Sequence, residues 1–197
     1  MKNNLLAILL IVSISSASGQ NDSLVMKRVS NKLYYSNSFI VGGLFGEDGS
    51  GNTFSGAMNH GIRYGRLATG LGISFDSYTE WRSVPVYGYL SFDLLPIQNN
   101  ALFIFASGGY SHSWYGLEVQ PGSTSYDAKG GGYFNSMLGY RIKANQYRIY
   151  VGCGYKFQRI NYRYASIWWW DTTIPAPSTS VEMDLNRFTV QIGFGWN

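Results

Sequence analysis

Apolar side chains occupy every second position near the end of the chain: Phe188, Val190, Ile192, Phe194 and Trp196. The positions between them hold Thr, Gln and two Gly. Because successive side chains of a β-strand point to opposite faces, one face of this segment is wholly apolar and the other is small or polar. An aromatic strand of this kind is typical of a transmembrane β-barrel, whose outer face contacts lipid.

The N-terminus has the pattern of a secretory signal peptide. Lys2 supplies the positive charge, residues 5–14 form the apolar segment, and the small residues at 17–19 predict cleavage before Gln20. The apolar segment is shorter than the roughly 20 residues that a spanning helix needs, and no later segment qualifies. We therefore expect a signal peptide over 1–19, a periplasmic lead-in over 20–32 and a barrel domain over 33–197.

The composition fits a barrel wall and excludes several other functions. Aromatic residues make up 17% of the chain and charged residues only 13%, which is low for a soluble surface. The net charge of +4 comes without a Lys/Arg run, so nucleic acid is not an expected partner. The single cysteine, Cys153, excludes an intramolecular disulfide and a cysteine metal site. No metal-binding spacing, phosphate loop or cofactor motif is present, and we expect no cofactor.

The rest of the chain divides into similar alternating segments. Connections between them are alternately short and long, which is the wiring of an outer-membrane barrel with periplasmic turns and extracellular loops. A soluble up-and-down barrel would instead turn its apolar face inward around a ligand and its charges outward. The fold class is thus an all-β, eight-stranded, antiparallel up-and-down transmembrane β-barrel. Its strands are expected at about 33–46, 54–65, 69–78, 84–95, 101–113, 130–142, 147–160 and 183–196.

This pattern resembles the small eight-stranded outer-membrane barrels of the OmpX, opacity-protein and OmpA-transmembrane type. The resemblance covers nearly the whole chain after the signal, and it rests on pattern rather than on a diagnostic motif. The ending from Gly193 to Trp196 is similar to the signal that the barrel-assembly machinery reads in such proteins. Asn197 departs from it, because many members end on an aromatic residue. The resemblance implies a monomer in the outer membrane, surrounded by lipid and lipopolysaccharide.

Several charged residues fall on the face that points into the lumen. An eight-stranded barrel is just wide enough to be filled by its own side chains, and buried charges require partners. We expect an ionic plug, with a gated ion path as the alternative. Four of the charges are placed near the periplasmic turns and two nearer the middle. The six are Arg63, Asp93, Arg141 and Arg148, and then Asp76 and Lys156.

Aromatic residues also gather in the longest predicted extracellular loop. Interfacial girdles explain most tryptophans of a barrel, but three consecutive ones exceed what a girdle needs. Together with neighbouring Tyr and Arg, they are candidates for binding a surface glycan, a protein ligand or lipopolysaccharide. The candidate residues are Tyr162, Arg163, Tyr164, Trp168, Trp169 and Trp170.

The expected function is a structural or cell-surface recognition role through the extracellular loops. The alternatives are a lipid A-modifying enzyme and a narrow pore. An enzyme would centre on His112, but Ser111 and Ser113 are adjacent to it in sequence and should point to the opposite face. A nucleophile must lie within hydrogen-bond reach of its base, so we do not expect an enzyme.

Overall fold

The computed structural model describes residues 32–46, 52–97, 99–117, 125–144, 146–165 and 178–196. The predicted signal peptide and all of the lead-in except Lys32 lie outside them. Within the described residues, no helix is long and apolar enough to cross a membrane. They form eight strands: β1 (Leu33–Phe45), β2 (Thr53–Tyr64), β3 (Leu67–Ser77), β4 (Trp81–Ile97), β5 (Asn100–Tyr115), β6 (Ser125–Ala144), β7 (Tyr147–Ala165) and β8 (Ser178–Trp196).

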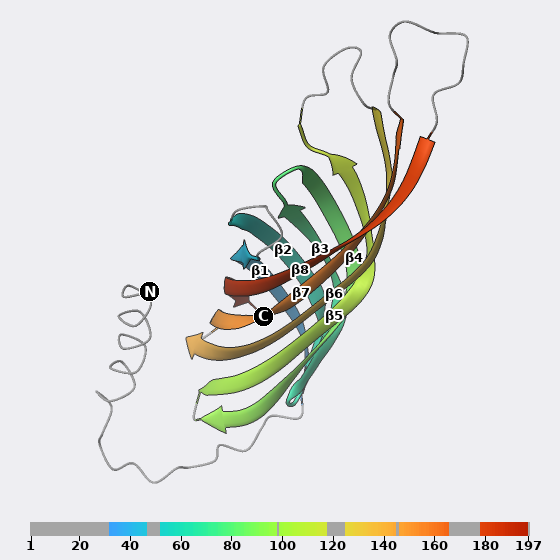
Figure 1. Ribbon diagram of the computed structural model, residues 1–197. Coiled ribbons are helices and arrows are strands. Elements are labelled where there is room, and N and C mark those ends of the chain that lie inside the picture. The colour runs from blue at the N-terminus through green and yellow to red at the C-terminus, as the bar shows by residue number, and fades with distance from the viewer. Residues whose placement is uncertain are drawn as a thin grey trace, which may run out of the picture.

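The strands form one closed, tilted barrel (Figure 1). Each strand pairs antiparallel with the next, and β8 returns to pair with β1. The closing register places Phe194 of β8 opposite Phe39 of β1 on one side and Ile149 of β7 on the other. Closure removes the free edges that an open sheet would expose. The predicted eight-stranded, antiparallel up-and-down fold is confirmed.

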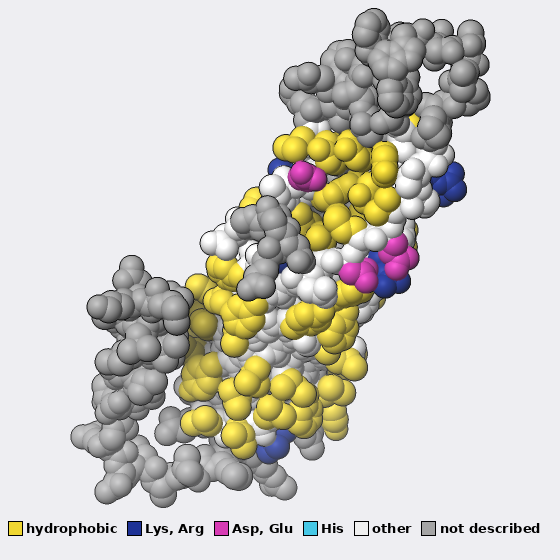
Figure 2. Space-filling view, viewed as in Figure 1, with side chains coloured by type: hydrophobic (Ala, Val, Ile, Leu, Met, Phe, Trp, Pro, Cys, Tyr) yellow, Lys and Arg dark blue, Asp and Glu magenta, His cyan; other side chains and the backbone are white. Residues whose placement is uncertain are grey.

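The two faces of the wall have opposite chemistry. Along β8 the alternation seen in the sequence separates exposed Phe188 from buried Thr189, and exposed Ile192 from buried Gln191. Large apolar side chains point outward from all eight strands, and they cover much of the visible wall in Figure 2. The interior is lined mostly by polar residues and aromatic rings. This is the reverse of a soluble barrel and matches a wall surrounded by lipid.

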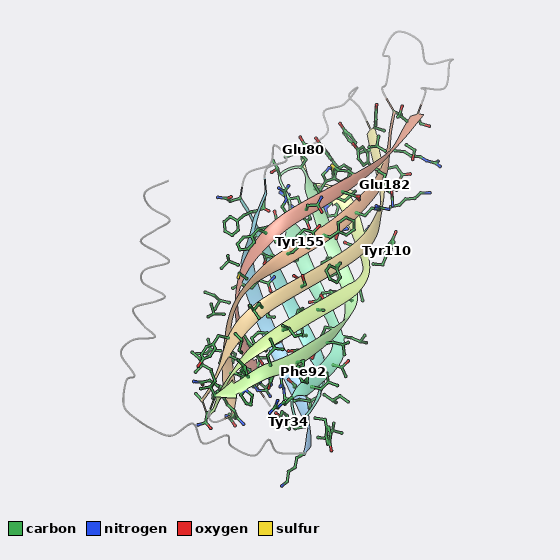
Figure 3. All side chains as sticks on the ribbon, turned by 60° about the horizontal axis from the view of Figure 1, so that its bottom comes forward. Tyr34, Glu80, Phe92, Tyr110, Tyr155 and Glu182 are labelled. Atoms are coloured by element: carbon green, nitrogen blue, oxygen red, sulfur yellow. The ribbon has the colours of Figure 1, made fainter. Side chains whose placement is uncertain are left out.

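The barrel has two different ends. Two-residue connections at 65–66, 98–99 and 145–146 join strands at what we call the turn end. In the first of these, Gly65 has a φ of 57°, a left-handed conformation that glycine adopts without strain. The other ends of the strands lie at the opposite end of the barrel, which we call the loop end. Figure 3 shows Tyr34 and Phe92 toward the turn end and Glu80 and Glu182 toward the loop end.

Three strands continue beyond the others at the loop end (Figure 1). Pairing of β8 with β1 stops at Phe188, and pairing of β6 with β5 stops at Gly131. Beyond these points β6, β7 and β8 remain paired as a three-stranded ribbon, which comprises residues 125–130, 161–165 and 178–182. A bulge at Gly130 marks the departure of β6, and its φ of 78° is again left-handed. A side chain there would overlap the Ser111 carbonyl oxygen.

Candidate functional site

The lumen near the turn end contains a charge cluster built from four strands. Arg63 of β2 donates from Nη1 to Oδ2 of Asp93 on β4 over 2.9 Å, and Arg141 of β6 donates to the same oxygen. Arg148 of β7 lies at the same end. All four side chains are buried. The structure therefore places this predicted group inside the barrel and joins three of its members through one carboxylate.

Arg148 has different partners from the other two arginines. Its Nη1 donates to the Ser36 hydroxyl over 3.1 Å and lies 3.5 Å from the Tyr150 hydroxyl. Its guanidinium carbon lies 5.5 Å from the centre of the Tyr34 ring. Among the described residues, no carboxylate lies within ion-pair distance of Arg148. Hydroxyls and a ring face thus stabilise this charge.

An aromatic layer fills the middle of the lumen. Tyr87 stacks on Tyr133 with ring centres 5.2 Å apart, and Tyr89 stacks on Phe105 at 5.6 Å. Phe103 and Met137 complete the buried cluster. The Tyr87 hydroxyl donates to Asn59 over 2.9 Å, so its polar end is satisfied. This layer separates the turn-end charges from those nearer the loop end.

The other two predicted lumen charges form an ion pair beyond this layer. Lys156 of β7 donates from Nζ to Oδ1 of Asp76 on β3 over 2.8 Å. Both residues also bond to Ser55 of β2, which accepts from Nζ at 2.8 Å and donates to the carboxylate at 2.6 Å. Asp76 and Lys156 are 0% and 1% exposed, so the pair is fully withdrawn from solvent.

Arg187 is a buried charge that the sequence reasoning missed. It lies on the lumen face of β8 and is 2% exposed. The alternation of β8 already identifies it, because Arg187 has the same parity as buried Thr189 and Gln191.

An apolar cap closes the lumen at the loop end. Leu44 and Ile160 are fully buried there and pack with Tyr78, Trp81 and Leu185. Further rings extend the cap outward. Trp81 lies 5.4 Å from the Tyr115 ring, 6.1 Å from Tyr126 and 4.8 Å from Tyr162, as measured between ring centres. We call Trp81, Tyr115, Tyr126 and Tyr162 the aromatic cap.

The predicted recognition residues are only partly described. Tyr162, Arg163 and Tyr164 belong to β7, and pairing with Ser180 of β8 and Asp127 of β6 holds Arg163 in the ribbon. Their assignment to a loop is therefore wrong. The apolar alternation ends where lipid contact ends, but backbone pairing continues, so the sequence pattern underestimated the strand. Trp168, Trp169 and Trp170 lie outside the described residues.

Tyr162 belongs to both the ribbon and the aromatic cap. Its ring lies 6.1 Å from Tyr126 and 6.4 Å from Tyr164. Burial raises the pKa of the Tyr162 hydroxyl, with smaller contributions from the neighbouring tyrosines. The hydroxyl therefore remains protonated at physiological pH and can donate a hydrogen bond to a ligand.

A charged group marks the outer limit of the apolar wall on β7 and β8. Arg159 donates to both carboxylate oxygens of Asp184, over 2.8 and 3.0 Å, and its Nη1 lies 2.9 Å from Glu182. The hydrogen bonds from Arg159 lower the pKa of the Asp184 carboxyl. Acidic and basic side chains gather on the loop-end half of the barrel in Figure 2. Lipid contact on these strands thus ends before this ion pair.

The residues of the enzyme alternative lie on opposite faces of β5. Ser111 and Ser113 are fully buried, and both hydroxyls hydrogen-bond to Ser83. His112 points outward and lies beside Trp114, with ring centres 6.2 Å apart.

His60 also points outward and bonds through Nδ1 to Asn37 over 2.7 Å and to Tyr35 over 3.0 Å. Among the described residues, no group of three or more His, Cys, Asp or Glu could hold a metal ion.

Comparison with solved structures identifies the fold. The crystal structure of neisserial surface protein A (NspA) superimposes with a TM-score of 0.56, covering 86% of this chain and 99% of that one at 10% identity. The chain has the fold of a small outer-membrane β-barrel. The predicted resemblance to this class is therefore confirmed at the level of the fold. The predicted outer-membrane location agrees with this fold and with the apolar wall.

Outer-membrane protein AlkL, solved by solid-state NMR in lipid bilayers, has a TM-score of 0.44 and 13% identity, over 90% of this chain and 96% of that one. No protein-family model matches the barrel sequence. No curated protein matches it either.

Proposed function

We propose that this outer-membrane barrel acts in cell-surface recognition, with the loop end as its working surface. The observation that carries the proposal is the ribbon, which extends β6, β7 and β8 beyond the point where β1 and β5 stop pairing with them. A barrel that served only to fill space in the membrane would not require these strands to continue. The ribbon holds Tyr162, Arg163 and Tyr164 at the base of the segment that contains the three consecutive tryptophans.

The chemistry of this surface suits a carbohydrate or a polar protein ligand. Aromatic rings and arginine are the residue types most enriched where binding energy concentrates. Tyrosine presents a rigid apolar face together with a hydroxyl that can bond to sugar hydroxyls. The partners we propose are lipopolysaccharide of the surrounding membrane, a surface glycan or a protein ligand. Delivery to the membrane by the barrel-assembly machinery belongs to the same proposal.

Replacing Trp168, Trp169 and Trp170 together with alanine should weaken binding about tenfold or more, because buried aromatic anchors each contribute a large share of binding energy. The measurement is binding of the refolded protein to a glycan array and to purified lipopolysaccharide. Replacing Trp114 with alanine is the matched control, since this outward-facing ring lies on the barrel wall. The triple variant should still show the mobility difference between unboiled and boiled samples that marks a folded barrel. Unchanged binding by that folded variant would refute the role of the loop end.

A closed lumen is part of the proposal and opposes the pore alternative. Support comes from the succession of turn-end charges, aromatic layer, Asp76–Lys156 pair and apolar cap, which fill the interior. Replacing Arg148 with alanine should leave single-channel conductance in planar bilayers unchanged, because the aromatic layer and the cap remain in place. An increase in conductance would instead make Arg148 part of a gate.

We also propose that the protein does not modify lipid A. The outward direction of His112 and the inward direction of Ser111 and Ser113 support this, because a base cannot activate a hydroxyl across the barrel wall. Mass spectrometry of lipid A from cells with and without the protein should give identical spectra. A change that disappears on replacing His112 with alanine would establish the enzyme instead.

A further inference from the structure

The lumen at the turn end contains more positive than negative charge. Among the described residues there, three guanidinium groups, of Arg63, Arg141 and Arg148, face one carboxylate, that of Asp93. All four side chains are at most 7% exposed. Withdrawing an ion from water is costly unless an opposite charge compensates it. This region therefore carries two positive charges without compensating carboxylates among those residues.

Each of the three arginines also has a buried nitrogen that makes no hydrogen bond within the protein. These atoms are Nε of Arg63, Nη1 of Arg141 and Nη2 of Arg148. Buried guanidinium N–H groups are strong donors that favour a charged acceptor. Oδ1 of Asp93 is the one carboxylate oxygen at the same end without a hydrogen-bond partner. The unused donors thus outnumber the unused acceptor by three to one.

A small cavity adjoins these groups. Its volume is about 30 Å³, and its lining includes Arg63, Ser36, Asn59, Phe103 and Tyr150. Arg148 donates to the hydroxyls of Ser36 and Tyr150, so it contacts two of the lining residues from outside the lining. Arg141 lies over the Phe103 ring, 5.9 Å from its centre. This volume is sufficient for a water molecule or a monatomic ion.

We propose that this cavity binds a single halide anion, chloride under ordinary conditions. The anion accepts hydrogen bonds from Arg63 and from the hydroxyl and amide groups of the lining, and it compensates one of the two excess charges. The site excludes cations because the surrounding charge is positive. The bound ion holds β1, β2 and β7 together at the turn end, since the lining residues Ser36, Arg63 and Tyr150 come from these three strands.

The direct test is the chloride dependence of unfolding in nonionic detergent micelles. Urea unfolding is followed at constant ionic strength while sodium chloride replaces sodium gluconate. A ligand that binds only the folded state raises the folding equilibrium constant in proportion to its concentration above the dissociation constant. We expect about a tenfold rise for each tenfold rise in chloride in that range. Equal stability in chloride and gluconate would show that only water occupies the cavity, and it would refute the site.

Two variants and a second probe localise the effect. Replacing Arg148 with glutamine should abolish the chloride dependence, whereas replacing Arg159 with glutamine, on the outer surface, should preserve it. If Arg148→Gln does not refold, crystals of the unaltered protein grown in sodium bromide provide the alternative. An anomalous bromine peak beside Arg63 and Arg148 is the expected result. A peak elsewhere only, or none, would overturn the assignment.

Discussion

Replacing Asp76 with alanine should lower the free energy of unfolding by about 3–5 kcal/mol, because it leaves the Lys156 ammonium buried without a carboxylate. Lys156 is 1% exposed, and within the part of the chain that the structure describes its one other hydrogen-bond partner is the Ser55 hydroxyl. The barrel wall around it prevents the side chain from reaching water. Reversible urea unfolding in detergent micelles, followed by tryptophan fluorescence, measures the loss.

Two further variants separate the effect of an unpaired charge from that of a lost contact. Replacing Lys156 with methionine in the Asp76→Ala background should restore most of the stability, since an uncharged chain of similar length needs no partner. Replacing Asp184 with alanine breaks the exposed pair with Arg159 and should change stability little, because solvent screens that pair. A large loss for Asp184 and none for Asp76 would contradict this description of the lumen.

Replacing Leu71 with arginine should destabilise the protein in lipid by about 2–4 kcal/mol, the cost of an arginine near the bilayer midplane. Leu71 is 69% exposed and lies at the middle of β3, so its side chain points directly outward from the wall. In a water-soluble barrel, an arginine at such an exposed position would change stability by about 0.5 kcal/mol or less. The experiment compares folding of the variant and the unaltered protein into phospholipid vesicles over a urea gradient.

The matched control for this prediction lies beyond the apolar wall. Thr179 is exposed in the ribbon, and replacing it with arginine should leave folding into vesicles unchanged. Equal behaviour of the two variants would mean that lipid does not surround β3. A loss confined to Leu71→Arg would demonstrate that the outward apolar side chains contact the membrane interior.

Much of the barrel follows from a local property of the backbone. A strand turns successive side chains to opposite faces, so the parity of Phe188, Ile192 and Trp196 determines which side of β8 faces lipid. In the same way, the alternation along β3 places Asp76 inside the lumen and the alternation along β7 places Lys156 there. Neither assignment requires knowledge of the neighbouring strands. Strand number, antiparallel order and the assignment of residues to faces are therefore contained in the sequence.

Other features depend on which strands become neighbours and at what register. The sequence placed Arg148 in a charge cluster, but closure of the barrel decides that it meets Ser36 and Tyr150 while Arg63 and Arg141 share Asp93. These groups come from strands far apart in sequence, and alternation says nothing about their relative heights.

The ribbon is the second feature that only the tertiary structure decided. Beyond the wall, no lipid selects apolar residues at every second position, so the sequence around Tyr162 has no clear strand pattern. Backbone pairing between β6, β7 and β8 nevertheless continues, because hydrogen bonds between neighbouring strands do not depend on side-chain polarity. The sequence by itself determined the wall and the lumen face, since alternation is local. Only the closed barrel determined which side chains become partners within the lumen. It also determined the ribbon that carries Tyr162, Arg163 and Tyr164. The physical reason is that strand register depends on residues far apart in the sequence, whereas alternation is a local property.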